Sequence, residues 1–396
     1  MRIIRFPIYL LLGMLIFGSA LCAVDIDDTG RQQQKLGRGI TSSIARDRLG
    51  NLHVVYLSSD AKLYYGFRSA GSDRWFTLPV LESTHSIQNV YPRIAVGANG
   101  QPHICVATGQ LHYITVQDGK WLQQDIDPNA GTLSYHCSIA VASDGTPHVT
   151  WYHEFLPGGK QFAHLRHAQL ENGVWVVRSV DGGISGKWNS MVIDDKGLPH
   201  VSYSQFADGG ALRYAVWDGQ VWSIADVDSF HKASTVKIGE SSGDASSAKG
   251  YDNSLALAND GSPLISYIDD TKLKLAERKE KWNIETVGYV SGSYDYYAGS
   301  TTLLLDSHGA PHIIFGDNGA IKHAFRDGDK WKIETIVAAG VQQYGNVDAV
   351  LGDDVLYVTY PDPEDGFVKL VTVPLAMTKS TGQNSSSKPT QVITDK

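Results

Sequence analysis

The amino-acid sequence predicts an all-β fold, a seven-bladed β-propeller with four antiparallel strands in each blade. Three observations predict it. A motif in which an apolar segment leads into a Gly-x-Pro-His turn recurs seven times along the 396 residues, with one decayed copy, and residues 138–148 are a clear example. The copies follow one another at intervals of roughly 45 to 65 residues, which suits propeller blades. Short apolar segments alternate with turn residues throughout, as in other all-β repeats.

Each unit is expected to supply its four strands in order. The first strand, such as residues 139–142, is almost entirely apolar, as expected of an inner strand near the propeller axis. The Gly-x-Pro-His turn leads to a second strand, such as residues 148–152, and a third follows, such as residues 212–217. An Asp-Gly turn then precedes a tryptophan that opens the fourth strand, at Trp121, Trp175, Trp222, Trp282 and Trp331. Residues 31–38 are expected to pair with the last blade near Val371, which leaves no free sheet edge.

The amino end predicts export from the cytoplasm. Arg2 and Arg5 precede an apolar run over residues 6–17 and small residues follow it, as in a secretory signal peptide. The run is too short to predict a membrane-spanning helix. We therefore expect a signal over residues 1–23, a catalytic propeller over 24–377 and a disordered polar tail over 378–396, in a secreted or periplasmic protein. Cys22 leaves open the alternative of a lipid-anchored protein. Leu21 fits this alternative poorly, because lipoprotein signals have a small residue before the cysteine.

Charge and cysteine content limit the possible partners. The formal net charge of -8 gives no general attraction for nucleic acid, so an anionic ligand must be held by a local basic cluster. No nucleic-acid partner and no membrane span are expected, and the protein is expected to be a monomer. Cys105 and Cys137 lie at early-strand positions, and buried free thiols are predicted for them in preference to a disulfide or a metal site.

The repeat separates structural residues from functional candidates, because a residue shared by all copies has a structural role in most cases. A structural hydrogen-bonding role, rather than a ring of metal ligands, is predicted for the turn histidines, His53, His103, His148, His200 and His312. Core packing is predicted for His164, in a column with Tyr65 and Tyr214. In a propeller, the loop before the first strand and the loop after the second emerge on the same face, and loops carry most functional residues. The functional site is expected there.

One position on that face has no consensus. It lies twelve residues before the turn histidine and is occupied by Thr41, Tyr91, His136, Trp188, Asp252 and Ser300. His136 is the leading candidate, because imidazole accepts or donates a proton near neutral pH. A rim histidine bonded to a neighbouring loop is the structural alternative.

Other candidates surround His136. His153 follows the second strand of the same unit, and Tyr203 and Tyr267 end second strands in the next two, where packing and function are equally plausible. Arg213 opens a third strand and suits carboxylate recognition. Arg93 replaces Ser, Thr or Val at an inner-strand position, where an anion in the central channel would balance its charge. Paired carboxylates, a Ser-His-Asp set, metal-ligand spacing and the Ser-x-Asp box of sialidases are not apparent in this sequence.

The repeat motif, the segment Leu-Arg-Tyr-Ala-Val-Trp-Asp-Gly at residues 212–219 and the secretion signal resemble the seven-bladed propeller polysaccharide lyases, notably ulvan lyases. The likeness covers nearly the whole mature chain. It implies cleavage of an anionic, uronate-containing polysaccharide by β-elimination, with no cofactor required and with a structural metal ion possible.

The resemblance also implies roles for individual residues. His136 would be the base, Tyr203 the acid, and Arg213 with His153 would neutralise the carboxylate, while base and acid could be exchanged. Tyr251 or Tyr267 would line the substrate groove. Arg93 and Trp188, which differ from the other residues of their repeat columns, are expected to bind substrate as well. Two other functions stay open: a secreted carbohydrate-binding propeller without catalysis, and a scaffold or adhesion domain.

Overall fold

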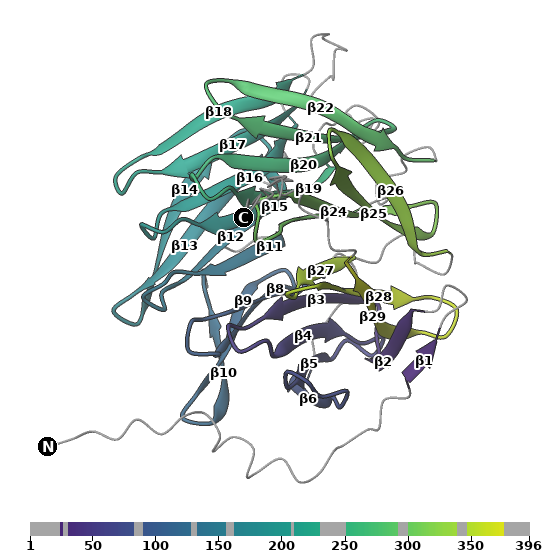
Figure 1. Ribbon diagram of the computed structural model, residues 1–396. Helices are drawn as coiled ribbons and strands as arrows, with labels where there is room; N and C mark the ends of the chain where they lie inside the picture. The colour runs from purple at the N-terminus through teal and green to yellow at the C-terminus, as the bar shows by residue number, and fades with distance from the viewer. Residues whose placement is uncertain are drawn as a thin grey trace, which may run out of the picture.

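The computed structural model describes residues 24–26, 31–82, 90–127, 133–155, 162–206, 210–229, 251–291, 300–338 and 347–375. The predicted signal (residues 1–23), including Cys22, and the tail (residues 378–396) lie outside them. The described strands form seven antiparallel sheets, six with four strands and one with five, as Figure 1 shows. The predicted seven-bladed propeller is therefore confirmed.

The first three blades contain twelve strands in chain order. Blade 1 consists of β3 (Thr41–Arg46), β4 (Leu52–Leu57), β5 (Leu63–Arg68) and β6 (Phe76–Leu81). Blade 2 consists of β7 (Arg93–Val96), β8 (Pro102–Ala107), β9 (Leu111–Gln117) and β10 (Lys120–Asp125). Blade 3 consists of β11 (Leu133–Val141), β12 (Pro147–Phe155), β13 (Phe162–Glu171) and β14 (Val174–Asp181).

The remaining blades follow the same order until the last. Blade 4 consists of β15 (Ser185–Ile193), β16 (Pro199–Gln205), β17 (Ala211–Trp217) and β18 (Trp222–Ser229). Blade 5 consists of β19 (Tyr251–Leu257), β20 (Pro263–Asp269), β21 (Lys272–Arg278) and β22 (Trp282–Tyr289). Blade 6 consists of β23 (Thr301–Leu305), β24 (Pro311–Asp317), β25 (Ala320–Asp327) and β26 (Lys330–Val337).

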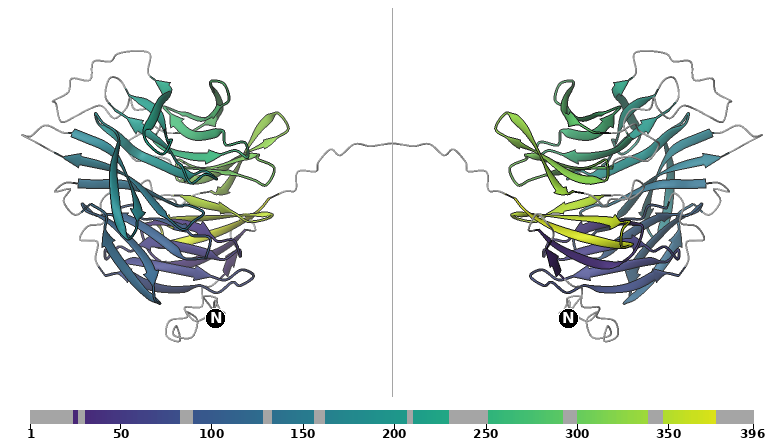
Figure 2. Two further views of the ribbon diagram at one scale, coloured as in Figure 1. Left: turned by 90° about the vertical axis from the view of Figure 1, so that its left-hand side faces the viewer. Right: turned by 90° about the vertical axis from the view of Figure 1, so that its right-hand side faces the viewer.

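Blade 7 combines both ends of the chain. It contains β27 (Asp348–Leu351), β28 (Val355–Asp362) and β29 (Phe367–Pro374), followed outward by β2 (Gln32–Arg38) and β1 (Val24–Ile26). Gln33 lies opposite Val371 in this sheet, so the predicted closing pair is confirmed. Figures 1 and 2 show the purple amino-terminal strands beside the yellow carboxyl-terminal ones. The ring is closed within a sheet rather than at a blade boundary.

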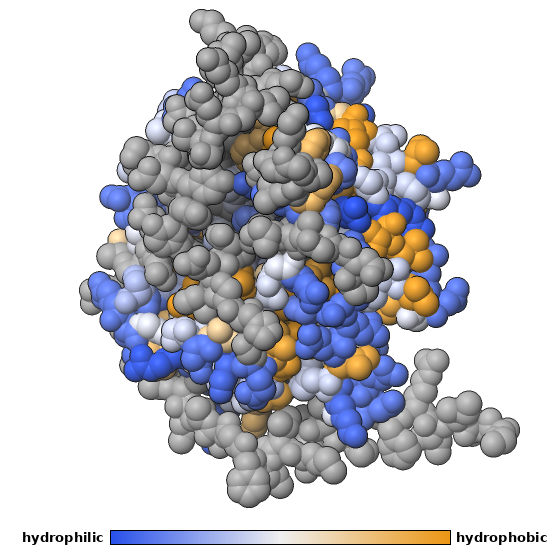
Figure 3. All heavy atoms as spheres, turned by 180° about the vertical axis from the view of Figure 1, so that it is seen from behind, coloured by the Kyte–Doolittle hydropathy of each residue, from blue (hydrophilic) through white to orange (hydrophobic). Residues whose placement is uncertain are grey.

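Seven apolar clusters fill the interfaces between neighbouring blades. One example joins Leu165 of blade 3 to Met191 and Tyr203 of blade 4, and another joins blade 7 to blade 1 through Leu370 and Ile44. Because each sheet buries both faces against its neighbours, the second strands are almost completely buried. On the side of the molecule in Figure 3, apolar surface residues form only small groups among hydrophilic ones.

The turn histidines have the predicted structural role. The Nδ1 atom of His53 lies 2.7 Å from the Tyr65 hydroxyl, and that of His103 lies 2.5 Å from the Tyr113 hydroxyl. The same contact recurs in three further blades, in the pairs His148–His167, His200–Tyr214 and His312–His323. These buried contacts join the second strand to the third in five of the blades.

The prediction for His164 is wrong. The residue of blade 3 that occupies the tyrosine column is His167, which lies opposite Thr150 as Tyr65 lies opposite Val55. His164 lies three residues earlier, at the end of β13 nearest the functional face. The β12–β13 hairpin is longer than its counterparts. The extra residues shift the third strand of blade 3 relative to the other copies of the repeat, so His164 was aligned with the tyrosines in place of His167.

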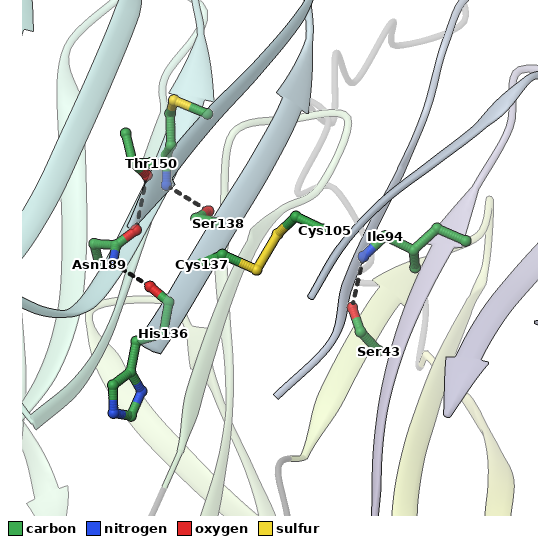
Figure 4. The surroundings of a disulfide bond; sticks show 9 residues. Ser43, Ile94, Cys105, His136, Cys137, Ser138, Thr150 and Asn189 are labelled. Atoms are coloured by element: carbon green, nitrogen blue, oxygen red, sulfur yellow. Dashed lines mark hydrogen bonds between the residues drawn. A yellow bond between two sulfur atoms is a disulfide. The ribbon is translucent and has the colours of Figure 1, made fainter. Parts of the chain in front are cut away.

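The prediction of free thiols is also wrong, because Cys105 and Cys137 form a disulfide. Cys105 lies in β8 of blade 2 and Cys137 in β11 of blade 3, with their Cα atoms 6.4 Å apart (Figure 4). Both side chains point into the interface between the two blades, a relationship that neither local sequence reveals. The bond crosslinks adjacent blades one residue after His136.

Candidate functional site

Strand register confirms that the two predicted loops emerge at the same end of the blades. In blade 3, Ser134 near the start of β11 lies opposite His153 near the end of β12, and in blade 4 Ser185 lies opposite Gln205. The start of each first strand and the end of each second strand therefore share one end of the blade. His136 and His153 lie at that end.

His136 and Trp188 occupy equivalent irregularities in their inner strands. Each lies in a β-bulge and has a left-handed backbone, with φ of 48° for His136 and 47° for Trp188. A residue other than glycine in the left-handed region of backbone conformation raises the free energy of the folded state by roughly 1–2 kcal/mol. Such a cost needs specific support from the surrounding structure.

Asparagines of the following blade supply that support. The Nδ2 atom of Asn189 donates to the carbonyl oxygens of His136 (2.5 Å) and Gly186 (2.9 Å), and its Oδ1 atom accepts from Thr150 (2.7 Å). Asn253 of blade 5 donates in the same way to the carbonyl oxygen of Trp188, at 2.6 Å. Both ring-bearing residues are thus held from the neighbouring blade.

The side chains of this variable position form a row of rings across three blades. The Tyr91 and His136 rings stack with centroids 5.3 Å apart and an interplanar angle of 16°. His136 lies 5.6 Å from Trp188, and Trp188 lies 5.6 Å from Phe206, both in tilted arrangements. All four side chains are half-buried. They form a partly exposed aromatic surface at the functional face.

Two cations lie beside this row. The Lys187 ammonium is 5.4 Å from the ring centroids of Tyr152 and Phe206 and 6.0 Å from that of Trp188. Burial, then the positive charges of Lys187 and Arg93, lower the pKa of His136 to about 3. The imidazole is therefore neutral at physiological pH. We call Tyr91, Arg93, His136, Lys187, Trp188 and Phe206 the aromatic-basic cluster.

Arg93 interrupts a ring of inner-strand hydroxyls. The Ser43 Oγ atom accepts from the backbone nitrogen of Ile94 in the next blade, and Ser138, Ser190 and Ser254 accept in the same way from Met191, Leu255 and Leu303. Arg93 stands at this place in blade 2. Its guanidinium is 4.0 Å from the Asp348 carboxylate, at the limit of an ion pair, and its side chain is 34% exposed. This cation remains accessible to an anionic ligand.

Tyr203 and Arg213 meet at a different place, the interface between blades 3 and 4. The Tyr203 hydroxyl donates to the Asp181 carboxylate at 2.8 Å, and Arg213 donates to Asp181 at 2.9 Å and to Asp226 at 2.8 Å. Tyr203 is completely buried, and burial and the Asp181 charge raise its pKa well above the usual range. The guanidinium charge is already balanced by two carboxylates.

The same contact recurs in the next blade. Tyr267 donates to Asp228 at 2.7 Å, and Lys274 donates to Asp228 at 3.1 Å. At the preceding interface, Arg166 of blade 3 donates to Asp127 of blade 2 at 3.0 Å. Each set has an aspartate at or near the end of one blade's fourth strand, which contacts a cation and, in two cases, a tyrosine of the next blade. We call each such set an interblade clamp. Because it repeats, it gives Tyr203, Tyr267 and Arg213 a part in joining blades.

His153 lies in a third environment. Its side chain is 3% exposed and faces blade 2, opposite His164 in the sheet. Burial, then the nearby Arg166, lowers its pKa to about 4. Among the residues with described side chains, no hydrogen bond or ion pair joins His153 to His136, or either histidine to Tyr203 or Arg213.

The structure thus brings together part of the predicted set. His136, Trp188 and Arg93 lie in the aromatic-basic cluster, whereas Tyr203, Tyr267 and Arg213 belong to interblade clamps. Tyr251 pairs with Ile268 in β19, but its side chain lies outside the described residues. Lys187, Phe206 and Asn189 were missed. A repeat signal existed for Asn189, because Asn253 holds the same position one blade later.

The described residues contain no group of three or more histidine, cysteine, aspartate or glutamate side chains that could hold a metal ion. Nor does that part of the chain include a helix long and apolar enough for a membrane crossing.

No family model matches the chain, and no curated protein matches it. Solved structures do. The lectin BP39L from Burkholderia pseudomallei is 12% identical, with a TM-score of 0.60 over 86% of this chain and 97% of the lectin. A protein of unknown function from Dyadobacter fermentans is 11% identical, with a TM-score of 0.52 over 87% and 99% of the two chains. AofleA from Arthrobotrys oligospora is also 11% identical, with a TM-score of 0.51 over 82% and 95%. At these identities the likeness concerns the fold alone.

Proposed function

We propose that this protein is an exported carbohydrate-binding propeller that binds acidic glycans at the aromatic-basic cluster. The observation that carries the proposal is the row of Tyr91, His136 and Trp188 at the one inner position where the repeat has no consensus. Flat, partly exposed rings offer an apolar surface with polar edges, which suits the faces and hydroxyls of sugar rings. The fold is shared with a bacterial lectin, which supports the same class of function.

The cations beside the rings favour an acidic ligand. Lys187 and Arg93 give the cluster a local positive charge in a chain whose net charge is -8. A carboxylate or sulfate bound here would be partly desolvated, so each charge-assisted hydrogen bond would be strong. The neutral His136 ring adds a hydrogen-bonding group without adding charge.

The Cys105–Cys137 disulfide supports export, because disulfides persist mainly in oxidising compartments. Together with the predicted secretion signal, it favours a secreted or periplasmic location.

Binding to immobilised polysaccharides tests the proposal. The native protein should bind uronate polymers such as ulvan, alginate or pectate more tightly than neutral dextran. Trp188→Ala should weaken binding at least tenfold, about 1.4 kcal/mol. Lys187→Ala should weaken binding to the acidic polymers selectively. Ser300→Ala changes the equivalent position of blade 6 and serves as the control. Unchanged binding in the Trp188 variant would exclude this cluster as the site.

A polysaccharide lyase is the second candidate, and the environment of His136 favours it. Lys187 and Arg93 near His136 could offset the charge that develops when a uronate loses its C5 proton. The imidazole is unprotonated at physiological pH, as a base must be, but a pKa of about 3 makes it a weak base. In this reading His136 takes that proton, the bond from C4 to the leaving oxygen breaks, and Tyr203 protonates the leaving oxygen. The resemblance assigns the carboxylate to Arg213 and His153, and this role would require Arg213 to leave Asp181 and Asp226 and the buried His153 to become accessible. Tyr203 would first have to break its hydrogen bond to Asp181.

Ultraviolet absorption separates the two candidates. A lyase generates an unsaturated uronyl end, whose double bond conjugated with the carboxylate absorbs ultraviolet light, whereas a lectin forms no such product. His136→Ala should then abolish turnover and retain binding. If the protein binds a uronate polymer but no ultraviolet-absorbing product forms over prolonged incubation, the lyase is excluded and carbohydrate binding remains as the function.

A further inference from the structure

Blade 3 carries a hairpin that extends beyond its counterparts. β12 has nine residues and β13 ten, whereas β16 and β17 of blade 4 have seven each. The pair Trp151–Arg166 corresponds to Tyr203–Arg213, and the next pair on the same side, His153–His164, corresponds to Gln205–Ala211. Blade 4 pairing ends there, but blade 3 continues to Phe155–Phe162.

The extra length carries rings on one side of the sheet. Phe155 and Phe162 stack with centroids 5.4 Å apart and an interplanar angle of 18°. The Phe155 ring meets His164 edge-on at 5.2 Å and lies 5.9 Å from His153. Directly opposed and alternate residues of paired strands point to the same side. We call His153, Phe155, Phe162 and His164 the hairpin strip.

The hairpin strip faces blade 2 at the end of the molecule that carries the site. Arg166 continues the same alternation and pairs with Asp127 of blade 2, which fixes the side. Ser134, His153 and His164 lie in one row across β11, β12 and β13. Neighbouring strands are about 4.8 Å apart, so His153 and Phe155 in β12 lie about 5 Å outward from β11, the inner strand that holds His136. His164 and the exposed Phe162 in β13 lie roughly 10 Å outward.

Exposure increases toward the tip. His153 is buried, His164 and Phe155 are half-buried, and the Phe162 side chain is 42% exposed. The equivalent of the His153–His164 pair in blade 5 is Asp269–Lys272, so the strip is not part of the repeated packing. A stacked aromatic pair with one exposed member and no repeated structural role suits a binding surface.

We propose that the hairpin strip is a second saccharide subsite, which stacks on a later sugar unit of the glycan chain bound at the aromatic-basic cluster. This inference rests on the proposed function. Phe162 and Phe155 offer the apolar surface, and the nitrogen atoms of His164 offer hydrogen bonds to hydroxyls. Burial, followed by the nearby Arg166, lowers the pKa of His164, so the subsite selects for ring faces rather than for charge. A disaccharide at the cluster does not reach the strip, and a longer chain does.

Chain-length dependence of binding tests this inference. Dissociation constants are measured by calorimetry for oligosaccharides of a bound uronate polymer, from disaccharide to octasaccharide. For the native protein, affinity should rise as the chain becomes long enough to reach the strip. Phe162→Ala should remove that rise, with roughly tenfold weaker binding of the octasaccharide and an unchanged dissociation constant for the disaccharide. Val174→Ala, an exposed change at the opposite end of blade 3, should behave like the native protein.

The outcomes separate the two proposals. An unchanged length profile in Phe162→Ala, with Trp188→Ala still impaired, overturns the second subsite and leaves carbohydrate binding intact. Weaker disaccharide binding in Phe162→Ala also overturns it, because the strip would then belong to the first subsite. Failure of the native protein to bind any of the polymers overturns the proposed function itself.

Discussion

Cys105 and Cys137 form a disulfide at a position where the next three blade interfaces have a hydrogen bond (Figure 4). Thr150 donates to Asn189 at 2.7 Å, Ser202 donates to Asn253 at 2.5 Å, and Ser266 donates to Thr301 at 3.0 Å. Each contact joins the second strand of one blade to the first strand of the next. The covalent bond is therefore a variant of a repeated interblade contact.

This equivalence predicts that a hydrogen bond can partly replace the disulfide. Removing it as Cys105→Ala/Cys137→Ala should lower the free energy of unfolding by about 4 kcal/mol, given the separation of 32 residues. Cys105→Ser/Cys137→Asn copies the Ser202–Asn253 pair and should recover about 1 kcal/mol. Urea unfolding without reductant measures both variants. Equal stability of the native protein with and without reductant would contradict the prediction.

The sequence was sufficient for the architecture because the repeat constrains it many times over. Seven copies of one motif predict seven sheets, and the need to close the ring predicts the pairing of Gln33 with Val371. The cysteine prediction failed because each thiol was judged within its own strand. In the repeat alignment, Cys105 holds the position of Thr150 and Cys137 that of Asn189. These two positions meet across the interface between neighbouring blades, so a comparison of the two positions across all blades would have predicted the disulfide.

The site was predicted in part for a related reason. Variation at one column identified Tyr91, His136 and Trp188, which do lie side by side. Phe206 follows a second strand in blade 4, and its contact with Trp188 depends on how that strand end folds over the bulge. The bond between Tyr203 and Asp181 crosses a blade boundary, so neither residue's own unit reveals it.

Asn189 is predicted to position His136. Asn189→Asp keeps the acceptor for Thr150 but removes the donor that supports the His136 carbonyl oxygen, so the left-handed backbone loses its support. Glycan binding should weaken about fivefold to tenfold, and near-ultraviolet circular dichroism from the adjacent Trp188 should change. Thr301→Val breaks the related contact between blades 5 and 6 and should affect stability alone. Native-like binding by Asn189→Asp would contradict the positioning role.

Tyr203→Phe tests whether the interblade clamp is the main role of this tyrosine. The change removes only the hydroxyl that donates to Asp181 and should lower the free energy of unfolding by about 2 kcal/mol, because the acceptor is charged. Tyr267→Phe removes the matching bond to Asp228 and should cost a similar amount. Glycan affinity should be unchanged in both variants. Loss of uronate turnover in Tyr203→Phe alone would instead support a proton-donor role.

Stability should fall in mild acid, and His103 is a clear source. Burial lowers the pKa of His103 to about 4, against about 6.5 in the unfolded chain. The folded state keeps this imidazole neutral, so the unfolded state binds a proton first as the pH falls. The contribution is fully present above pH 6.5 and is lost progressively down to about pH 4, by up to about 3 kcal/mol. The double variant His103→Leu/Tyr113→Leu copies Leu264 and Leu275, which fill these positions in blade 5. Its free energy of unfolding should depend less steeply on pH between 6.5 and 4. The slope should correspond to the uptake of up to one proton fewer on unfolding than in the native protein. A slope identical to that of the native protein would show that His103 is not a source of the acid sensitivity.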